Sequence, residues 1–423
     1  MNDPDRCLLS GFAHYASQRF QLPLLAAGLT DGRSQPRIPL RPVALSLLLG
    51  EVAHISSFLQ LQEETKLPEW QRWVGGRGPI SHDTFGYVSE RLDPAELRRA
   101  ARYIHRKLKR GKAFEANKIN GLLGVNLDAN EQFCSDHRCC EQCLTRTVKC
   151  RNACGEEVQK TQYYHKQVYA QLSGPELSVI LDFEPLRQGE EECAAALRLL
   201  RRLRATYGPR FFDVVVVDSW YANGPFLKTV VEELGWPVIA VLKQERFEVH
   251  QEALALSQKQ PGQVVERDGR RVEIWDVRSL RFSDRYAGPV RVVRVRETWT
   301  QREQTGPEWS QTPKEQNWLW VVAGDLDGYD GAVIRDLGHS RWKIENHAFG
   351  QLTQHWHLTH CAHHHPVAVV ALLWIKILAF TLFQAFAILH GKLYRLGKVT
   401  FQELRKRIYR SLFCGCPLRL FSG

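Results

Sequence analysis

Two patterns of hydrophobic and polar positions divide the chain. Between about residues 38 and 112, apolar side chains recur at three- and four-residue spacing, which is typical of amphipathic helices. Beyond residue 120 the pattern changes to short apolar or alternating runs, which predict β-strands separated by helices. The predicted strands are 121–127, 163–172, 177–183, 212–217 and 237–242, and the predicted helices are 190–207 and 225–234.

This order favours one fold class. Three strands, a helix, a strand, a helix and a strand are expected of an RNase H-like α/β core with a mixed sheet, although other mixed α/β folds share the order. Further β-like runs at 272–277, 290–299 and 318–322 predict an inserted β-rich subdomain. We therefore expect a helical region (1–115), a first core part (116–242), the β-rich insertion (243–317), a second core part (318–390) and a basic C-terminal tail (391–423).

The helical region carries a weak helix-turn-helix pattern. Pro68 and the glycines that follow break the helical periodicity, and Ser81 then offers an N-cap for a short helix. The stretch 97–112 is rich in arginine and lysine. On a helix it would form either a track for phosphate groups, with Arg106, Lys109 and Arg110 among its members, or a solvated face.

Composition agrees with a polyanionic partner. The chain has 57 Lys and Arg residues against 46 Asp and Glu residues, a formal net charge of +11. Such an excess favours nucleic acid, because neutralising phosphates releases condensed counterions. No secretory signal opens the sequence, so we expect a reducing, cytoplasmic location.

A cysteine cluster in the loop 134–154 predicts a metal site of the zinc-knuckle kind. In a reducing compartment, closely spaced cysteines indicate metal before disulfides. The predicted ligands of a structural Zn²⁺ are Cys140, Cys143, Cys150 and Cys154, with Cys139 and His137 as substitutes. Cysteines that bind no metal are the alternative. Six histidines between 355 and 365 follow no spacing that closes a site.

One apolar segment, 367–389, is long enough to cross a bilayer. Lys376 near its centre would cost about 2.5–3.5 kcal/mol on insertion. A helix buried in a large core is therefore the preferred interpretation, and a membrane span is the alternative.

Three acidic residues are candidates for catalysis. Asp128 and Asp218 each follow an apolar run, which would place them at the edge of the sheet where α/β proteins bind ligands. Either one alone could equally be a turn former. Glu345 lies on a helix whose buried stripe is Ile344, Ala348 and Leu352, and Arg341 precedes it by one turn as an ion-pair partner or a phosphate ligand. Together the three acids would suit Mg²⁺.

These residues stand in strings that resemble a known family. Arg341-Trp-Lys-Ile-Glu-Asn346, with a downstream Phe and Leu, resembles the Glu motif of bacterial insertion-sequence DDE transposases. Asp218-Ser-Trp-Tyr-Ala-Asn-Gly-Pro-Phe resembles their second-Asp motif. The first-Asp region of one branch is similar to Leu127-Asp-Ala-Asn-Glu, followed by Cys140-x2-Cys143-Leu-x-Arg146 and Tyr163-Tyr-His165.

The resemblance implies both a reaction and its cofactors. Asp128, Asp218 and Glu345 would bind two Mg²⁺ or Mn²⁺ ions, and the enzyme would cleave transposon ends and transfer them into target DNA. The family's wider motif also has a Tyr and a Lys, where this chain has Gly338 and Leu352. Family members use aromatic residues of the insertion against DNA ends, so Trp299, Trp309, Trp318 and Trp320 are candidates, although Trp318 and Trp320 could instead pack on the sheet.

The expected function is that of a DNA transposase. Its partners would be double-stranded DNA, as transposon ends and target, and a second copy in the DNA complex, with no membrane and a nucleoid-associated location. The alternatives are a metal-dependent nuclease, a catalytically silent DNA-binding protein derived from a transposase, and an integral membrane protein. The residues expected to contact DNA are Arg341, Asn346, Lys243, Tyr221, Arg106, Lys109 and Arg110.

Overall fold

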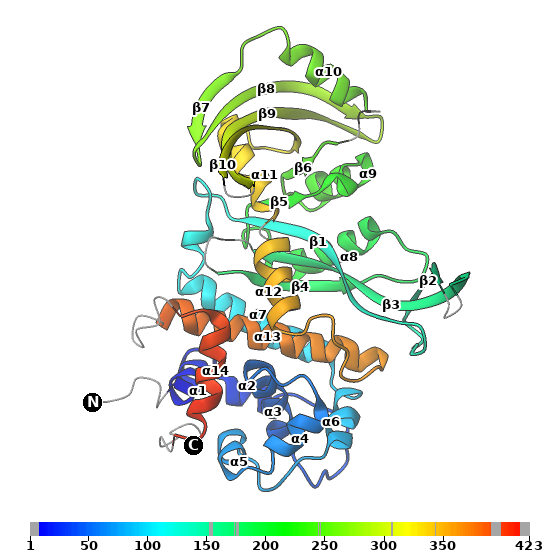
Figure 1. The fold of residues 1–423 in the computed structure, drawn as a ribbon, viewed down its shortest axis with the longest axis vertical. Helices are drawn as coiled ribbons and strands as arrows, with labels where there is room; N and C mark the ends of the chain where they lie inside the picture. Colours follow the sequence, from blue (N-terminus) through cyan, green and yellow to red (C-terminus); the bar gives the residue numbers. More distant parts are fainter. Residues whose placement is uncertain are drawn as a thin grey trace.

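The structure is a computed structural model of the 423-residue chain. It describes residues 8–151, 155–172, 174, 177–243, 245, 247–305, 308–342, 344–390 and 399–414. Within these ranges the side chains of 303–305, 308–309, 346 and 347 are not described. Figure 1 shows an elongated molecule with helices at one end, a mixed sheet in the middle and long strands at the other end.

The N-terminal region is helical, as predicted. The apolar run from residue 43 to 59 does not form one helix, because the chain turns at His54 with a positive φ of 68°. The predicted N-cap is confirmed, since the Ser81 hydroxyl accepts a hydrogen bond from the Thr84 amide. The helices are α1 (Leu8–Phe20), α2 (Leu22–Ala27), α3 (Leu40–Val52), α4 (Phe58–Glu64), α5 (Pro68–Val74), α6 (His82–Ser89) and α7 (Pro94–Arg110), followed by a 3₁₀ turn (Glu115–Asn117).

A five-stranded core follows, with the strand order β4-β3-β1-β5-β6. β3 runs antiparallel to both β1 and β4, whereas β5 and β6 run parallel to β1. Three antiparallel strands joined to two parallel ones make the predicted RNase H-like sheet. β2 pairs with the outer half of β3 as a hairpin. The strands are β1 (Gly124–Ser135), β2 (Leu144–Arg151), β3 (Glu157–Leu172), β4 (Val179–Pro185), β5 (Val214–Val217) and β6 (Val238–Val241).

The central strands explain the apolar runs of the sequence. Every residue of β5 and β6 is buried, because parallel strands are covered on both faces. α8 packs on β4 and β3. The connecting elements are α8 (Glu192–Tyr207), a 3₁₀ turn (Ser219–Tyr221), α9 (Gly224–Lys228) and a π-helix (Thr229–Glu233).

The inserted strands extend the same sheet instead of forming a separate one. The end of β10 pairs with β6 over four residues, Trp320 to Ala323, and β9, β8 and β7 follow in order. α10 packs on β8 (Figure 1). The elements are α10 (Glu248–Ser257), β7 (Gln263–Arg267), β8 (Arg270–Ser283), β9 (Tyr286–Thr305) and β10 (Glu308–Ala323).

The chain then returns to the core and to the N-terminal helices. α13 lies between the sheet and the helical region (Figure 1). It is long and apolar enough to cross a membrane, and 83% of its most apolar window is buried inside the structure. The prediction of a core helix is therefore confirmed, and the Lys376 ammonium is paired with the Glu51 carboxylate at 2.8 Å. The helices are α11 (Gly331–Ser340), a π-helix (Ile344–Phe349), α12 (Gly350–His355) and α13 (Pro366–His390).

Part of the predicted C-terminal tail is a packed helix. α14 (Phe401–Ser411) lies against α1 and buries Leu404 and Ile408. Its Arg405 is also buried and donates hydrogen bonds to the carbonyls of Val52 and Glu51. Arg405 therefore anchors this C-terminal helix to the N-terminal helices.

Candidate active site and metal centre

Two of the candidate acids come from adjacent parallel strands. β1 and β5 pair up to Asn126 and Val216, and Asp128 and Asp218 each lie two residues further along. Asp218 follows the end of β5, as predicted. Asp128 does not end its strand, and that prediction was wrong: β1 continues to Ser135 because it stays paired with β3, where Asp128 is opposite Tyr169.

The third acid reaches the same place from a helix. The Arg341 Nη1 lies 2.7 Å from a Glu345 carboxylate oxygen and 3.4 Å from an Asp128 carboxylate oxygen. Arg341 is buried, whereas the Glu345 side chain is 47% exposed. The predicted stripe of Ile344, Ala348 and Leu352 is fully buried. This stripe fixes the helix against the core, so that one guanidinium bridges the acids of strand and helix.

The charges around Asp128 are not balanced. Burial raises the pKa of Asp128 from 3.8 to about 7. Arg341 and the Ala129 amide lower this pKa, whereas the negative charges of Glu345 and Asp218 raise it further. The three acids therefore act on one another, and among the described residues Arg341 is the one cation that lowers the pKa of Asp128.

Asp218 is held by its own backbone turn. One carboxylate oxygen accepts a hydrogen bond from the Trp220 amide at 2.8 Å, which starts the 3₁₀ turn Ser219–Tyr221. The turn directs Tyr221 into the core, where its ring lies 5.4 Å from that of Phe226 and is fully buried. The prediction that Tyr221 contacts DNA was therefore wrong. The neighbouring Trp220, which was not among the predicted contacts, is 58% exposed.

Comparison with known families agrees with this geometry. The family whose model matches residues 165–382, just over half of the chain, is described as the transposase DDE domain. The chain belongs to this family. The matched range contains Asp218 and Glu345. Asp128 lies before it, so its place among the acids rests on the strand pairing and on its contact with Arg341.

Among solved structures, the DDE chain is similar to the piggyBac transposase in a synaptic complex with hairpin DNA. The two share 12% sequence identity with a TM-score of 0.42, over 97% of this chain and 80% of that one. No curated protein matches the chain.

Two basic residues of the predicted phosphate track are instead used for packing. Arg106 donates a hydrogen bond to the Thr206 carbonyl at 3.0 Å, and Lys109 donates to the Arg210 carbonyl at 2.7 Å. The Thr206 carbonyl lies in the last turn of α8, where cations are favoured by the helix dipole, and the Arg210 carbonyl lies in the turn that follows. Both side chains are half-buried where α7 docks on the DDE core, and their contact with DNA stays a prediction. Arg110 is exposed and stays a candidate.

The other predicted DNA contacts differ in accessibility. Lys243 is exposed just after β6 and stays a candidate. Arg341 faces the carboxylates, not open solvent. The side chain of Asn346 lies outside the described residues. Trp318 and Trp320 stack on one face of β10 with ring centroids 5.8 Å apart, and the ring of Trp318 lies 4.6 Å from that of Trp342. Sheet packing therefore accounts for this pair.

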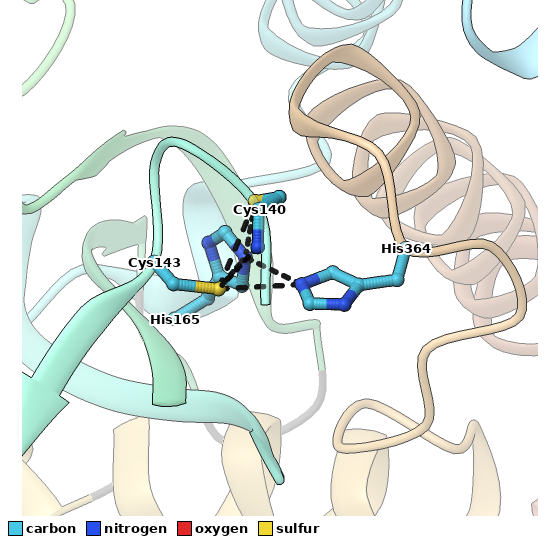
Figure 2. A group of neighbouring side chains, drawn as sticks. All are labelled: Cys140, Cys143, His165 and His364. Carbon is cyan, nitrogen blue, oxygen red and sulfur yellow. Dashed lines mark hydrogen bonds between the residues drawn. The ribbon is translucent and has the colours of Figure 1, made fainter. Parts of the chain in front are cut away.

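A second polar group gathers cysteine and histidine side chains (Figure 2). The thiols of Cys140 and Cys143 meet the imidazoles of His165 and His364, with all four ligand atoms within 4.8 Å of one another. Burial raises the pKa of Cys143 to about 11. Burial, followed by the neighbouring His364, lowers the pKa of His165 to about 4. Burial also lowers the pKa of His364. Both imidazoles therefore favour the neutral form, which has a lone pair available for a metal.

Two of the four predicted cysteines lie in this group. Cys140 and Cys143 belong to the group, but Cys150 does not: it is paired with Val158 across the β2–β3 hairpin, and its thiol points to the Val158 carbonyl at 3.7 Å. Cys154 lies outside the described residues. The histidines were missed as ligands because they are distant in sequence. His165 could have been found from its place in a strand beside the Cys140–Cys143 turn, whereas His364 was hidden among six clustered histidines.

Proposed function

We propose that the chain is a DNA transposase of insertion-sequence type, which cleaves transposon ends and transfers them into target DNA. The observation that carries this proposal is the meeting of Asp128, Asp218 and Glu345 from two parallel strands and one helix. Membership of the transposase DDE domain family supports the same reaction.

The donor set fits divalent metal ions. Carboxylate oxygens are the ligands that Mg²⁺ and Mn²⁺ prefer. Burial raises the pKa of Asp128, and two neighbouring acids raise it further. A bound cation would offset both effects and stabilise the ionised carboxylate. We infer that the three acids would hold two such ions. Bound there, the ions would help to activate the attacking oxygen and to stabilise the leaving oxygen of a phosphodiester.

The other residues of the site hold these acids in place. Arg341 fixes the Asp128 and Glu345 carboxylates toward each other, and the amide of Trp220 fixes one oxygen of Asp218. The exposed ring of Trp220 provides a flat surface next to Asp218, which suits stacking on an unpaired base. These contacts orient the site before DNA arrives.

Several charges support a DNA partner. The net charge is +11, and Arg110 and Lys243 are exposed. Because two transposon ends must be joined, we propose a homodimer in the DNA complex, and a cytoplasmic, nucleoid-associated location is part of the same proposal.

The test uses the full-length protein and duplexes that carry the DNA flanking its coding sequence, with Mg²⁺ or Mn²⁺. We expect nicked ends and joined products, and neither from Asp218→Asn. Glu131→Gln is a matched control, because Glu131 lies on the same strand as Asp128 but is ion-paired with Arg146 at the surface. Nicking without joining would indicate a nuclease, and binding without nicking a silent DNA-binding protein. Activity retained in Asp218→Asn would overturn the assignment of the acids.

A further inference from the structure

The Cys–His group has the dimensions of a tetrahedral zinc site. Bond lengths of about 2.3 Å to sulfur and about 2.0 Å to nitrogen require ligand separations of about 3.8 Å (S–S), 3.5 Å (S–N) and 3.3 Å (N–N). The Cys140 and Cys143 sulfurs are 3.7 Å apart. The His165 Nε2 lies 3.4 Å from each sulfur, and the two Nε2 atoms of His165 and His364 are 3.4 Å apart.

The chemistry of the ligands selects the ion. Two thiolates and two imidazoles in a tetrahedron favour Zn²⁺ over the oxygen-preferring Mg²⁺ or Mn²⁺ of the carboxylate site. The Cys140 amide also donates a hydrogen bond to the Cys143 sulfur at 3.3 Å, which stabilises a thiolate there. This contact is part of the tight turn in which the Cys143 amide donates to the Cys140 carbonyl.

The ligands come from segments that are far apart in the chain. Cys140 and Cys143 lie in the β1–β2 loop and His165 lies on β3, but His364 belongs to the loop between α12 and α13, 221 residues after Cys143 (Figure 2). The ring of His364 also contacts that of Phe133, with centroids 4.8 Å apart. A metal here would therefore join the strand hairpin to the segment that follows the Glu345 helix.

The loop that provides His364 also contacts the helical region. The preceding residue, His363, is hydrogen-bonded through Nε2 to the Glu90 carboxylate at 2.8 Å, just after α6. His363 therefore contacts the N-terminal helices, whereas the next residue, His364, contacts the hairpin. The loop 361–365 is the junction at which these two regions meet.

We propose that Zn²⁺ bound by Cys140, Cys143, His165 and His364 is a clamp that positions the strand of Asp128 against the helix of Glu345. Asp128 and Phe133 lie on the same strand, and His165 lies four residues before Tyr169, the partner of Asp128. Tyr169 in turn contacts Phe349 of the Glu345 helix, with ring centroids 5.1 Å apart. Through His364, the bound metal would also hold the loop that follows the Glu345 helix. Its positioning role rests on the proposed function, whereas zinc binding itself does not.

The first experiment measures zinc by mass spectrometry in the full-length protein after exchange into a buffer that contains Mg²⁺ only. We expect one zinc per chain in the wild type, and loss of zinc in Cys140→Ser and His364→Ala. Cys139→Ser is the matched control, because this exposed neighbour is outside the group, and Cys150→Ser separates the two cysteine sets. Zinc retained in Cys140→Ser or His364→Ala, or lost in Cys150→Ser, would overturn the ligand set.

Ligand identity has a spectroscopic test. In the Co²⁺-substituted protein we expect the absorption of a tetrahedral site with thiolate ligands. His364→Cys should restore one metal per chain, with a spectrum shifted toward a third thiolate. A spectrum without thiolate bands, or no restoration by His364→Cys where His364→Ala has lost the metal, would contradict the site.

The positioning role is tested through the Mg²⁺ requirement for DNA cleavage. On loss of zinc we expect the half-maximal Mg²⁺ concentration to rise by about 3- to 30-fold. If a variant fails to fold, zinc is removed from the wild type with a chelator and added back, and unfolding is followed alongside cleavage. An unchanged Mg²⁺ requirement after zinc loss would overturn the clamp while leaving the zinc site intact. Absence of cleavage in the zinc-loaded wild type would instead contradict the proposed function.

Discussion

Glu297 and Asp128 are both acids that the fold surrounds with charged groups, yet their pKa values move in opposite directions. Glu297 on β9 is fully buried and contacts Arg335 at 2.7 Å, Arg270 at 2.7 Å and His339 at 2.8 Å. Although burial raises its pKa, the hydrogen bonds of His339 and Arg335 outweigh burial and lower it to about 2. Burial of Asp128 is not outweighed in this way, and its pKa lies at about 7.

The difference lies in the charges that accompany each acid. Glu297 has cations on several sides and requires nothing further, which is the arrangement of a structural ion-pair network. The groups that shift the pKa of Asp128 include two further carboxylates and one guanidinium. A bound metal ion would stabilise the charge of a buried acid that has other acids around it. Such groups are typical of functional sites. The balance of charge separates a structural acid from a candidate catalytic one.

The largest expected effect is on catalysis. Glu345→Gln removes one proposed metal ligand, so we expect DNA cleavage to fall on the order of a thousandfold, about 4 kcal/mol of transition-state stabilisation. Because Glu345 is 47% exposed, the free energy of unfolding should change by no more than about 0.5 kcal/mol. Cleavage rates and urea unfolding of the same preparation check both. A decrease smaller than tenfold would remove Glu345 from the site.

Glu297→Gln, in contrast, should mainly lower the stability of the fold. It removes the buried carboxylate that Arg335 and Arg270 share, and leaves Arg335 only with the more exposed Asp336 and Asp268. We therefore expect a loss of about 3 kcal/mol in the free energy of unfolding. Urea denaturation measures it. Glu315→Gln on the neighbouring strand is the control, since Glu315 is exposed and its loss should cost less than about 0.5 kcal/mol. Equal stability of the two variants would refute the structural role of Glu297.

The pKa of Glu297 predicts acid sensitivity. Its folded pKa of about 2 lies below the usual 4.5, so its contribution to stability is fully present above pH 4.5 and is lost as the pH falls toward 2. That contribution is about 3 kcal/mol. Urea unfolding of the wild type between pH 5 and pH 3 should therefore show a steeper loss of stability than Glu297→Gln. Parallel pH profiles would contradict this.

The smallest effect concerns Asp128 without metal. Asp128 is ionised above its pKa of about 7, and there Asp128→Asn removes one of three neighbouring negative charges. At pH 8 in a chelator we therefore expect a gain of about 1 kcal/mol in the free energy of unfolding. Adding Mg²⁺ should raise the melting temperature of the wild type but not that of the variant. Glu131→Gln, whose partner Arg146 is at the surface, should change neither value. A less stable Asp128→Asn would show that the site is balanced without metal.

Pattern and motif predicted the core elements well. The helix expected at 190–207 is α8, Glu192–Tyr207, and the runs 212–217 and 237–242 became β5 and β6. The apolar segment 367–389 became the buried helix α13. These predictions succeeded because a strand covered on both faces, or a helix in the core, requires a continuous apolar sequence.

Errors arose where a side chain's partner is distant in sequence. Nothing local shows that Arg106 and Lys109 reach the end of α8 and the turn after it. The same is true of Tyr221, which turns inward while Trp220 stays exposed. The continuation of β1 past Asp128 depends on its pairing with β3. Basic or aromatic character alone does not decide between packing and DNA contact.

The sequence by itself determined the order of strands and helices and the three candidate acids, because hydrophobic periodicity and short motifs are local properties. Only the tertiary structure decided which charges meet. It placed Arg341 between Asp128 and Glu345, and it brought His364 to Cys140 and Cys143 in place of Cys150. Electrostatic balance and metal geometry depend on distances of a few ångströms between residues hundreds of positions apart, and only the folded chain sets these distances.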